Sequence, residues 1–180
     1  MKTLKIDKTW TLFLDRDGVI NKRLVGDYVK RIEEFEFLEG VEEAIARFND
    51  IFGRVLVVTN QQGIGKGLMT EDDLKKIHHH LEAEINDFGG KIDAYYHCPQ
   101  LASESPNCRK PSPSMGLQAQ AEFPEIDFKK CIMVGDSISD MEFGKNLGMT
   151  TVFISDGKKE NIFTDFYTTS LTKLASLVER

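Results

Sequence analysis

Short apolar runs alternate with longer amphipathic stretches along this chain of 180 residues. The apolar runs are nearly continuous and several are β-branched, which is typical of strands covered on both faces. They predict strands at Thr11–Leu14, Arg54–Thr59, Ile92–His97, Cys131–Gly135 and Thr151–Ile154, with a weaker one at Phe166–Thr168. The amphipathic stretches predict helices at Gly40–Asp50, Glu71–Phe88, Ser114–Phe123, Ser139–Leu147 and Leu171–Glu179.

The ends of two predicted helices carry capping residues. Thr70, with Asp73 three residues later, fits a capping box, and Gly148 suits a left-handed helix end. Because strands and helices alternate, we expect an α/β fold in which helices flank a parallel sheet. No internal repeat or linker interrupts the pattern, so residues 1–180 predict one domain. The irregular stretch Cys98–Pro113 holds four of the five prolines and predicts a functional loop.

Composition and charge narrow the class of partner. Hydrophobic residues make up 41% of the chain, charged residues make up 29%, and the formal net charge is −6. Acidic residues spread along the chain disfavour a nucleic-acid partner, although a local cation or metal still permits a small phosphorylated metabolite. The sequence holds no run long enough to span a membrane and no signal-peptide core, so we expect no membrane partner. Three cysteines form no evident disulfide framework, which favours a reducing, cytoplasmic location.

Polar residues gather where the predicted strands end. Asp15 and Asp17 follow the first strand, Thr59 and Asn60 end the second, and further groups follow the third (Arg109, Lys110) and the fourth (Asp136). In an open parallel sheet, ligands bind beyond the carboxyl ends of the strands. We therefore expect these side chains at one edge.

Several carboxylates at one edge predict a hard divalent cation. Mg²⁺ prefers oxygen ligands and binds through few carboxylates plus substrate phosphate, so Asp15, Asp17 and Asp136 are the predicted ligands. Asp140 would support these ligands without contacting the metal itself.

This arrangement predicts phosphoryl transfer. Asp15 would attack phosphorus and form an aspartyl-phosphate, while Asp17 would protonate the leaving alkoxide and later activate water. Thr59 and Asn60 would donate hydrogen bonds to phosphoryl oxygens. Lys110 would offset the charge on the nucleophile and the transferring group.

Four segments match, in order, the motifs of a known superfamily: Asp15-Arg16-Asp17-Gly18, Thr59-Asn60, Lys110, and the run from Gly135 to Asp140. The chain thereby resembles the haloacid dehalogenase (HAD) superfamily of phosphohydrolases over nearly its whole length. The resemblance implies a Rossmann-like sheet, Mg²⁺ and the chemistry above. The segments "FLDRDGVIN", "VVTNQQGIGKG" and "CRKPSP" resemble the subgroup of D-glycero-D-manno-heptose 1,7-bisphosphate and histidinol-phosphate phosphatases. In that subgroup a pair like Arg109-Lys110 meets the substrate.

The resemblance also implies where substrate range is set. The intervals between motifs leave no room for an inserted cap domain, so specificity must come from Gly26–Glu34, Gln61–Gly67 and Cys98–Arg109, with Gln61 among the substrate-binding residues. Many relatives hold a structural zinc in the last of these loops. Here only Cys98 and Cys108 of four ligands remain, so we expect no zinc, although His97 could add a third ligand. Some relatives carry a lysine where this chain has Ser137.

Other interpretations stay open at this stage. Removal of the 7-phosphate of a heptose bisphosphate is the leading hypothesis, ahead of histidinol phosphate and an octulosonate 8-phosphate. A receiver domain or a non-catalytic phosphate-binding module is a distant alternative. Gln61–Gly67 lacks the spacing of a nucleotide phosphate loop, and consecutive residues His78, His79 and His80 point in different directions on a helix. We expect a monomer or a weak homo-oligomer.

Overall fold

The computed structural model describes residues 5–157 and 161–178 of the chain. Six strands of the described residues form one sheet in the order β3-β2-β1-β4-β5-β6, and every neighbouring pair is parallel. The strands are β1 (Thr11–Leu14), β2 (Arg54–Asn60), β3 (Ala94–Cys98), β4 (Cys131–Gly135), β5 (Thr150–Ile154) and β6 (Phe166–Thr168). The predicted α/β fold with a parallel sheet is thus confirmed.

Successive side chains of each central strand point to opposite faces of the sheet, and both faces are buried. In β1, Leu12 and Leu14 enter one hydrophobic cluster while Phe13 enters the other. Val55 and Val57 of β2 lie in the same cluster as Leu12 and Leu14. This double burial explains why the strands read as continuous apolar runs.

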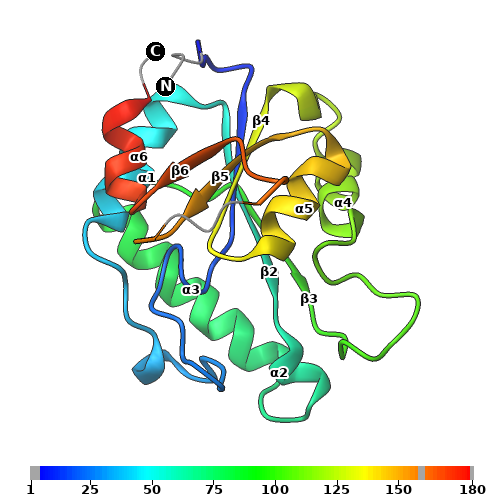
Figure 1. The fold of residues 1–180 in the computed structure, drawn as a ribbon. Helices are drawn as coiled ribbons and strands as arrows, with labels where there is room; N and C mark the ends of the chain where they lie inside the picture. Colours follow the sequence, from blue (N-terminus) through cyan, green and yellow to red (C-terminus); the bar gives the residue numbers. More distant parts are fainter. Residues whose placement is uncertain (1–4, 158–160, 179–180) are drawn as a thin grey trace.

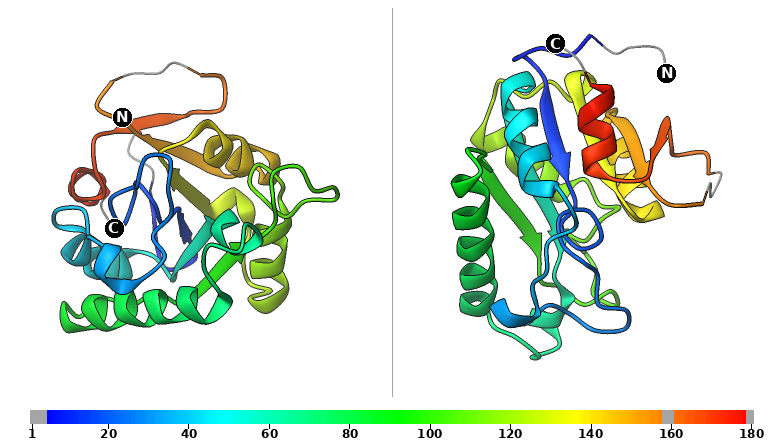
Figure 2. Two further views of the ribbon diagram at one scale, coloured as in Figure 1. Left: turned by 90° about the horizontal axis from the view of Figure 1, so that it is seen from below. Right: turned by 90° about the vertical axis from the view of Figure 1, so that its left-hand side faces the viewer.

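Helices cover both faces of the sheet, as Figures 1 and 2 show. The helices α1 (Val41–Ile51), α3 (Glu71–Asp87) and α6 (Leu171–Leu177) lie on one face, and α4 (Ser114–Glu122) and α5 (Ile138–Leu147) lie on the other. The two shorter 3-10 turns are η1 (Ile32–Glu34) and η2 (Phe128–Lys130). None of the helices between residues 5 and 178, outside the undescribed gap, combines the length and apolar character needed to cross a bilayer.

The predicted caps are confirmed. Thr70 and Asp73 form a reciprocal capping box at the start of α3, and Gly148 ends α5 with φ of 81°. Strand β3 begins and ends later than predicted, since Ala94 to Cys98 pair with Leu56 to Asn60 of β2. The predicted end of the last helix at Glu179 lies outside the described residues.

One short helix was not predicted. The segment after β2 forms α2 (Gln62–Gly65), because glycines there let the chain pack closely against its neighbours. A Cβ atom on Gly65 would lie 2.5 Å from the carbonyl oxygen of Pro99. The segment is therefore a compact turn against the long loop, and it lies at the carboxyl end of β2 (Figure 1).

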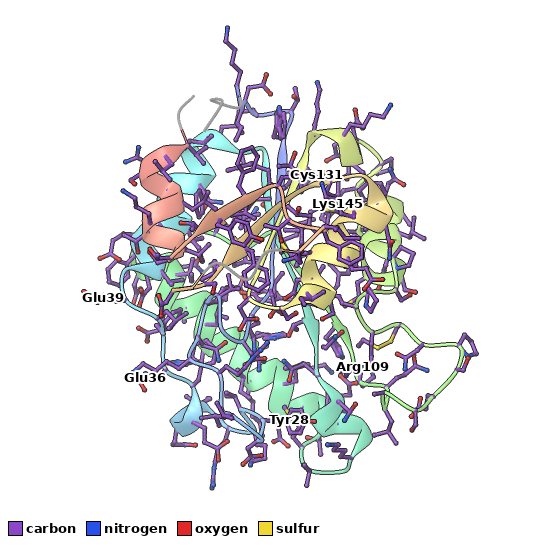
Figure 3. The ribbon with its side chains drawn as sticks, in the orientation of Figure 1. Tyr28, Glu36, Glu39, Arg109, Cys131 and Lys145 are labelled. Carbon is purple, nitrogen blue, oxygen red and sulfur yellow. A yellow bond between two sulfur atoms is a disulfide. The ribbon has the colours of Figure 1, made fainter. Side chains whose placement is uncertain are left out.

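The expectation of no disulfide is wrong for two of the three cysteines. Cys98 ends β3, the chain returns ten residues later, and Cys98 and Cys108 form a disulfide with their Cα atoms 5.6 Å apart. The bridge is drawn in yellow near Arg109 in Figure 3. Neither sulfur is then a thiolate that could bind zinc, and His97 instead contacts Glu71 with 2.8 Å between Nε2 and Oε2. Cys131 is free and buried.

Candidate active site

The order of the strands brings the predicted residues to one edge. β1 lies between β2 and β4, so the residues after β1 are flanked by those after β2 and β4. The chain reverses its order of strand addition between β1 and β4, which is the point where open α/β sheets bind ligands. Asp15 is held there by its backbone N–H, which donates to the Val134 carbonyl at 2.9 Å.

A buried lysine organises the acids at this edge. The Nζ atom of Lys110 lies 2.7 Å from Oδ1 of Asp15 and 2.6 Å from Oδ1 of Asp140, and it donates to the Val58 carbonyl at 2.8 Å. The Lys110 side chain is only 2% exposed. Although burial alone would lower its pKa, Asp140 and Asp15 raise the pKa of Lys110, so the amine stays charged.

Three carboxylates meet beside this lysine. Ligand atoms of Asp15, Asp136 and Asp140 all lie within 4.8 Å of one another. Burial, together with the neighbouring acids, raises the pKa of Asp15 to about 7 despite the opposing effect of Lys110. Burial also raises the pKa of Asp136 to about 6. Burial therefore makes ionisation of these acids costly unless a cation accompanies them.

The carboxylate of Asp17 has a separate set of partners. Its two oxygens both accept from Nη2 of Arg16, at 3.0 and 2.9 Å, and they accept one bond each from the side-chain amides of Asn21 (2.9 Å) and Gln61 (2.8 Å). Although burial opposes it, these donors, Arg16 foremost, hold the pKa of Asp17 below its usual value. Asp17 is thus fixed in one orientation beside the three-acid group.

The residues that end β2 support their neighbours. The Asn60 side chain accepts from the backbone N–H of Lys110 at 2.9 Å and donates to its carbonyl at 3.3 Å. The hydroxyl of Thr59 accepts from Gln61 at 2.9 Å, and both side chains are about 99% buried, with 1% exposed in each case. The side-chain amides of Asn60, the last residue of β2, and of Gln61, the next residue, thereby position Lys110 and Asp17 respectively.

Glycine is required next to the acids. Gly18 has φ of +95°, and a Cβ atom there would lie 2.0 Å from Oδ2 of Asp136. A Cβ atom on Gly135 would lie 2.2 Å from the Cβ of Asp140. These two close approaches explain why glycine follows Asp17 and precedes Asp136.

Sequence reasoning missed two arginines of the site. Arg16 is fully buried and pairs with Asp17. Arg23, on the loop after β1, donates to Oδ1 of Asp136 at 2.8 Å and lies 4.0 Å from Asp15. The signal for Arg16 was present, because a cation inside an otherwise buried segment needs an anionic partner.

Arg109 follows the disulfide-bridged loop and directly precedes Lys110 in the chain, and Figure 3 labels it. Its side chain is half-buried, and the buried Nη1 has no hydrogen-bond partner among the residues described. A buried guanidinium nitrogen without a partner is costly unless a ligand completes it. This donor is therefore available to an anionic ligand.

Fold and site together define a class of protein. The family model described as "HAD-hyrolase-like", for haloacid dehalogenase-like hydrolases, matches residues 107–172. The crystal structure of D,D-heptose 1.7-bisphosphate phosphatase from B. bronchiseptica, complexed with magnesium and phosphate, has a TM-score of 0.83 at 28% identity, covering 93% of this chain and 96% of that one.

Two sequence relatives narrow the class. A D-glycero-alpha-D-manno-heptose-1,7-bisphosphate 7-phosphatase of Mycobacterium tuberculosis is 43% identical over 138 residues, which cover 77% of this chain and 73% of the relative. The Campylobacter jejuni protein of the same name is 41% identical over 157 residues, covering 87% and 88%. This chain belongs to the family of D-glycero-D-manno-heptose 1,7-bisphosphate phosphatases.

Proposed function

We propose that this protein is a Mg²⁺-dependent phosphatase that removes the 7-phosphate of D-glycero-D-manno-heptose 1,7-bisphosphate. The carrying observation is the buried contact of Lys110 with Asp15 beside two further carboxylates, at the edge where the family's motifs meet. The names of the relatives favour the heptose bisphosphate over histidinol phosphate.

The donor set fits Mg²⁺. All ligand atoms of the three-acid group are carboxylate oxygens, and the acids outnumber Lys110 and Arg23, the two cations that contact them in the described part of the chain. We assign the ion to Asp15, Asp17 and Asp136. Asp15 and Asp136 belong to the three-acid group, whereas its third member, Asp140, is paired with Lys110. The Asp17 carboxylate lies beside this group and is paired with Arg16. A bound Mg²⁺ would neutralise the excess charge and polarise a phosphoryl oxygen.

In the first half of the proposed reaction, an oxygen of Asp15 attacks phosphorus and the bond to the sugar oxygen breaks. Lys110 holds the attacking carboxylate and offsets the charge on the transferring group. The departing alkoxide takes a proton from Asp17. Asp17 therefore enters this step protonated and leaves it as a carboxylate.

In the second half, water attacks the phosphorus of the aspartyl-phosphate and gives a proton to Asp17, while the bond from phosphorus to Asp15 breaks. The low pKa of Asp17 suits a carboxylate that begins this step ionised. Arg16 and Gln61 fix its direction. Asp140 keeps Lys110 in place, and Thr59, Asn60 and Arg109 bind the phosphate oxygens.

The test is hydrolysis of heptose 1,7-bisphosphate, both anomers, and of histidinol phosphate, with and without Mg²⁺. We expect hydrolysis to require Mg²⁺ and the heptose bisphosphate to have the highest kcat/KM of the three substrates. The substitution Asp15→Asn should lower kcat/KM about 10³-fold or more. Asp72→Asn, an exposed acid on α3, serves as the control. Undiminished turnover by Asp15→Asn would exclude the mechanism, and a higher kcat/KM with histidinol phosphate would exclude the substrate.

A further inference from the structure

A cleft of about 360 Å³ opens between the loop after β1 and the segment after β2. Asp17 and Asn60 line it from the catalytic edge, and Tyr28 and Lys66 line it from two segments outside that edge. The volume lies in the range of small-molecule sites. The cleft therefore joins the proposed reaction centre to residues that would meet the rest of a substrate.

The three segments predicted to set substrate range meet at one side chain. Gln62 of α2 donates through Nε2 to the Tyr28 hydroxyl at 3.3 Å, and its Oε1 accepts from the backbone N–H of Ala102 at 2.9 Å. Tyr28 lies low in the view of Figure 3, beside α2. The walls of the cleft are thus tied to one another.

The charged groups in and around the cleft are mostly paired. The Asp17 carboxylate binds Arg16, Asp27 binds Lys30 with 2.6 Å between Oδ2 and Nζ, and Arg23 binds Asp136. Lys66 differs: across residues 5–157 and 161–178, no carboxylate forms a salt bridge with it.

Lys66 is nevertheless held over the cleft. Its backbone N–H donates to the Gln62 carbonyl at 3.0 Å, and its Nζ atom lies 5.2 Å from the centroid of the Tyr28 ring. The contact of the ammonium with the ring face favours this direction of the side chain. The result is an exposed cation, without an acidic partner in the described part of the chain, beside the cleft that leads to the proposed catalytic acids.

We propose that Lys66 binds the phosphate that is not transferred, and so makes the enzyme select a bisphosphate over a monophosphate. This inference rests on the proposed function. A substrate with two phosphates places one at Asp15 and needs a cation for the other, because each phosphate carries between one and two negative charges. Arg23, the other cation that lines the cleft, is already paired with Asp136. Lys66 therefore supplies the positive charge that the second phosphate needs.

The test is the ratio of kcat/KM for heptose 1,7-bisphosphate to kcat/KM for heptose 7-phosphate, at fixed Mg²⁺ and ionic strength. We expect Lys66→Gln to lower this ratio about tenfold, the lower end for a charged hydrogen bond, because the site is exposed to solvent. Lys66→Arg keeps the charge and should retain most of the ratio. Lys75→Gln on α3, outside the cleft, is the matched control.

A second measurement separates binding from turnover. In the Asp15→Asn background, Lys66→Gln should raise the Kd for the bisphosphate by a similar factor and change the Kd for the monophosphate much less. A ratio that Lys66→Gln leaves at the wild-type value, while the wild type hydrolyses the bisphosphate, would overturn the Lys66 inference alone. Failure of the wild type to hydrolyse either heptose phosphate would overturn the proposed function and this inference with it.

Discussion

At the scale of single residues, the site is built from buried charges that each need a partner. Lys110 and Asp140 are 2% and 1% exposed in their side chains, so neither is solvated by water. Removing one partner of such a buried pair leaves the other charge uncompensated, which costs about 3–5 kcal/mol. The protein therefore carries a charge arrangement that stabilises the fold only when complete, and that also sets the chemistry.

Arg23 should compete with the metal. Its guanidinium contacts Asp136, which we assign as a metal ligand, from a side chain that is 46% exposed. Because an exposed pair is worth about 1 kcal/mol or less, Arg23→Gln should tighten Mg²⁺ binding about two- to fivefold. Isothermal titration with Mg²⁺ at fixed ionic strength measures this directly. Lys22→Gln is the adjacent control, and unchanged or weaker Mg²⁺ binding by Arg23→Gln would contradict the prediction.

His78 should make stability depend on pH. Burial lowers the pKa of His78 to about 3 from 6.5, helped by the positive charge of Arg16. The other groups that act on it are Asp17, which favours the cation, and His97 and His79, which disfavour it. The folded state binds fewer protons than the unfolded state between pH 6.5 and 3, so His78 contributes stability above pH 6.5 that is lost as the pH falls toward 3.

The variant His78→Phe tests this dependence. A phenyl ring can keep the stack on Tyr95, whose ring centroid lies 4.6 Å from that of His78, but it cannot take up a proton. Urea unfolding at several pH values between 7 and 4 should show a shallower loss of stability in His78→Phe than in the wild type. His79→Gln, on the exposed side of α3, is the control. Parallel pH curves for wild type and His78→Phe would refute the assignment.

At the scale of elements, two helices begin with the same kind of N-terminal cap, but only one of these caps contacts the site. Thr70 and Asp73 form a capping box on α3, and Ser137 and Asp140 form one on α5. Only the second is tied to the site, because Asp140 also contacts Lys110. Thr70→Ala and Ser137→Ala should each cost about 1 kcal/mol of stability.

Activity should separate the two caps. Ser137→Ala frees one side of Asp140, so kcat should fall severalfold, whereas Thr70→Ala should leave kcat unchanged. Urea unfolding of both variants supplies the matched stability values. An equal effect of the two substitutions on kcat would show that the Ser137 cap acts through stability alone.

The elements were predictable because each signal was local. The apolar runs predicted the strands, Gly148 predicted the end of α5, and the motif residues fell at the ends of their strands. The disulfide and the contact of Arg23 with Asp136 depend on how loops return after the sheet has formed, and local patterns carry no signal for that. Arg16 is intermediate, since its burial could have been inferred but its partner required the structure.

At the scale of the whole molecule, the site is open, and in the described part of the chain no cap domain is inserted between its motifs. Loops must then determine which substrate binds, and a loop can do so only if its conformation is fixed. Two connections hold them: the disulfide, which closes the loop from Cys98 to Cys108, and the side chain of Gln62. A small fold can thus build a cleft without adding a domain.

Gln62→Leu should loosen that cleft while leaving the acids that we propose as catalytic in place. The Ala102 amide would lose its acceptor, so its hydrogen exchange should accelerate, and KM for the heptose bisphosphate should rise severalfold with a smaller change in kcat. Gln120→Leu is a matched control, because Gln120 also holds a backbone group, the Ile126 carbonyl at 2.9 Å, but on α4. If Gln62→Leu changed kcat and KM no more than Gln120→Leu does, the prediction would be wrong. The three segments that Gln62 connects would then be held by their own packing, and the hydrogen bonds of Gln62 would contribute nothing measurable.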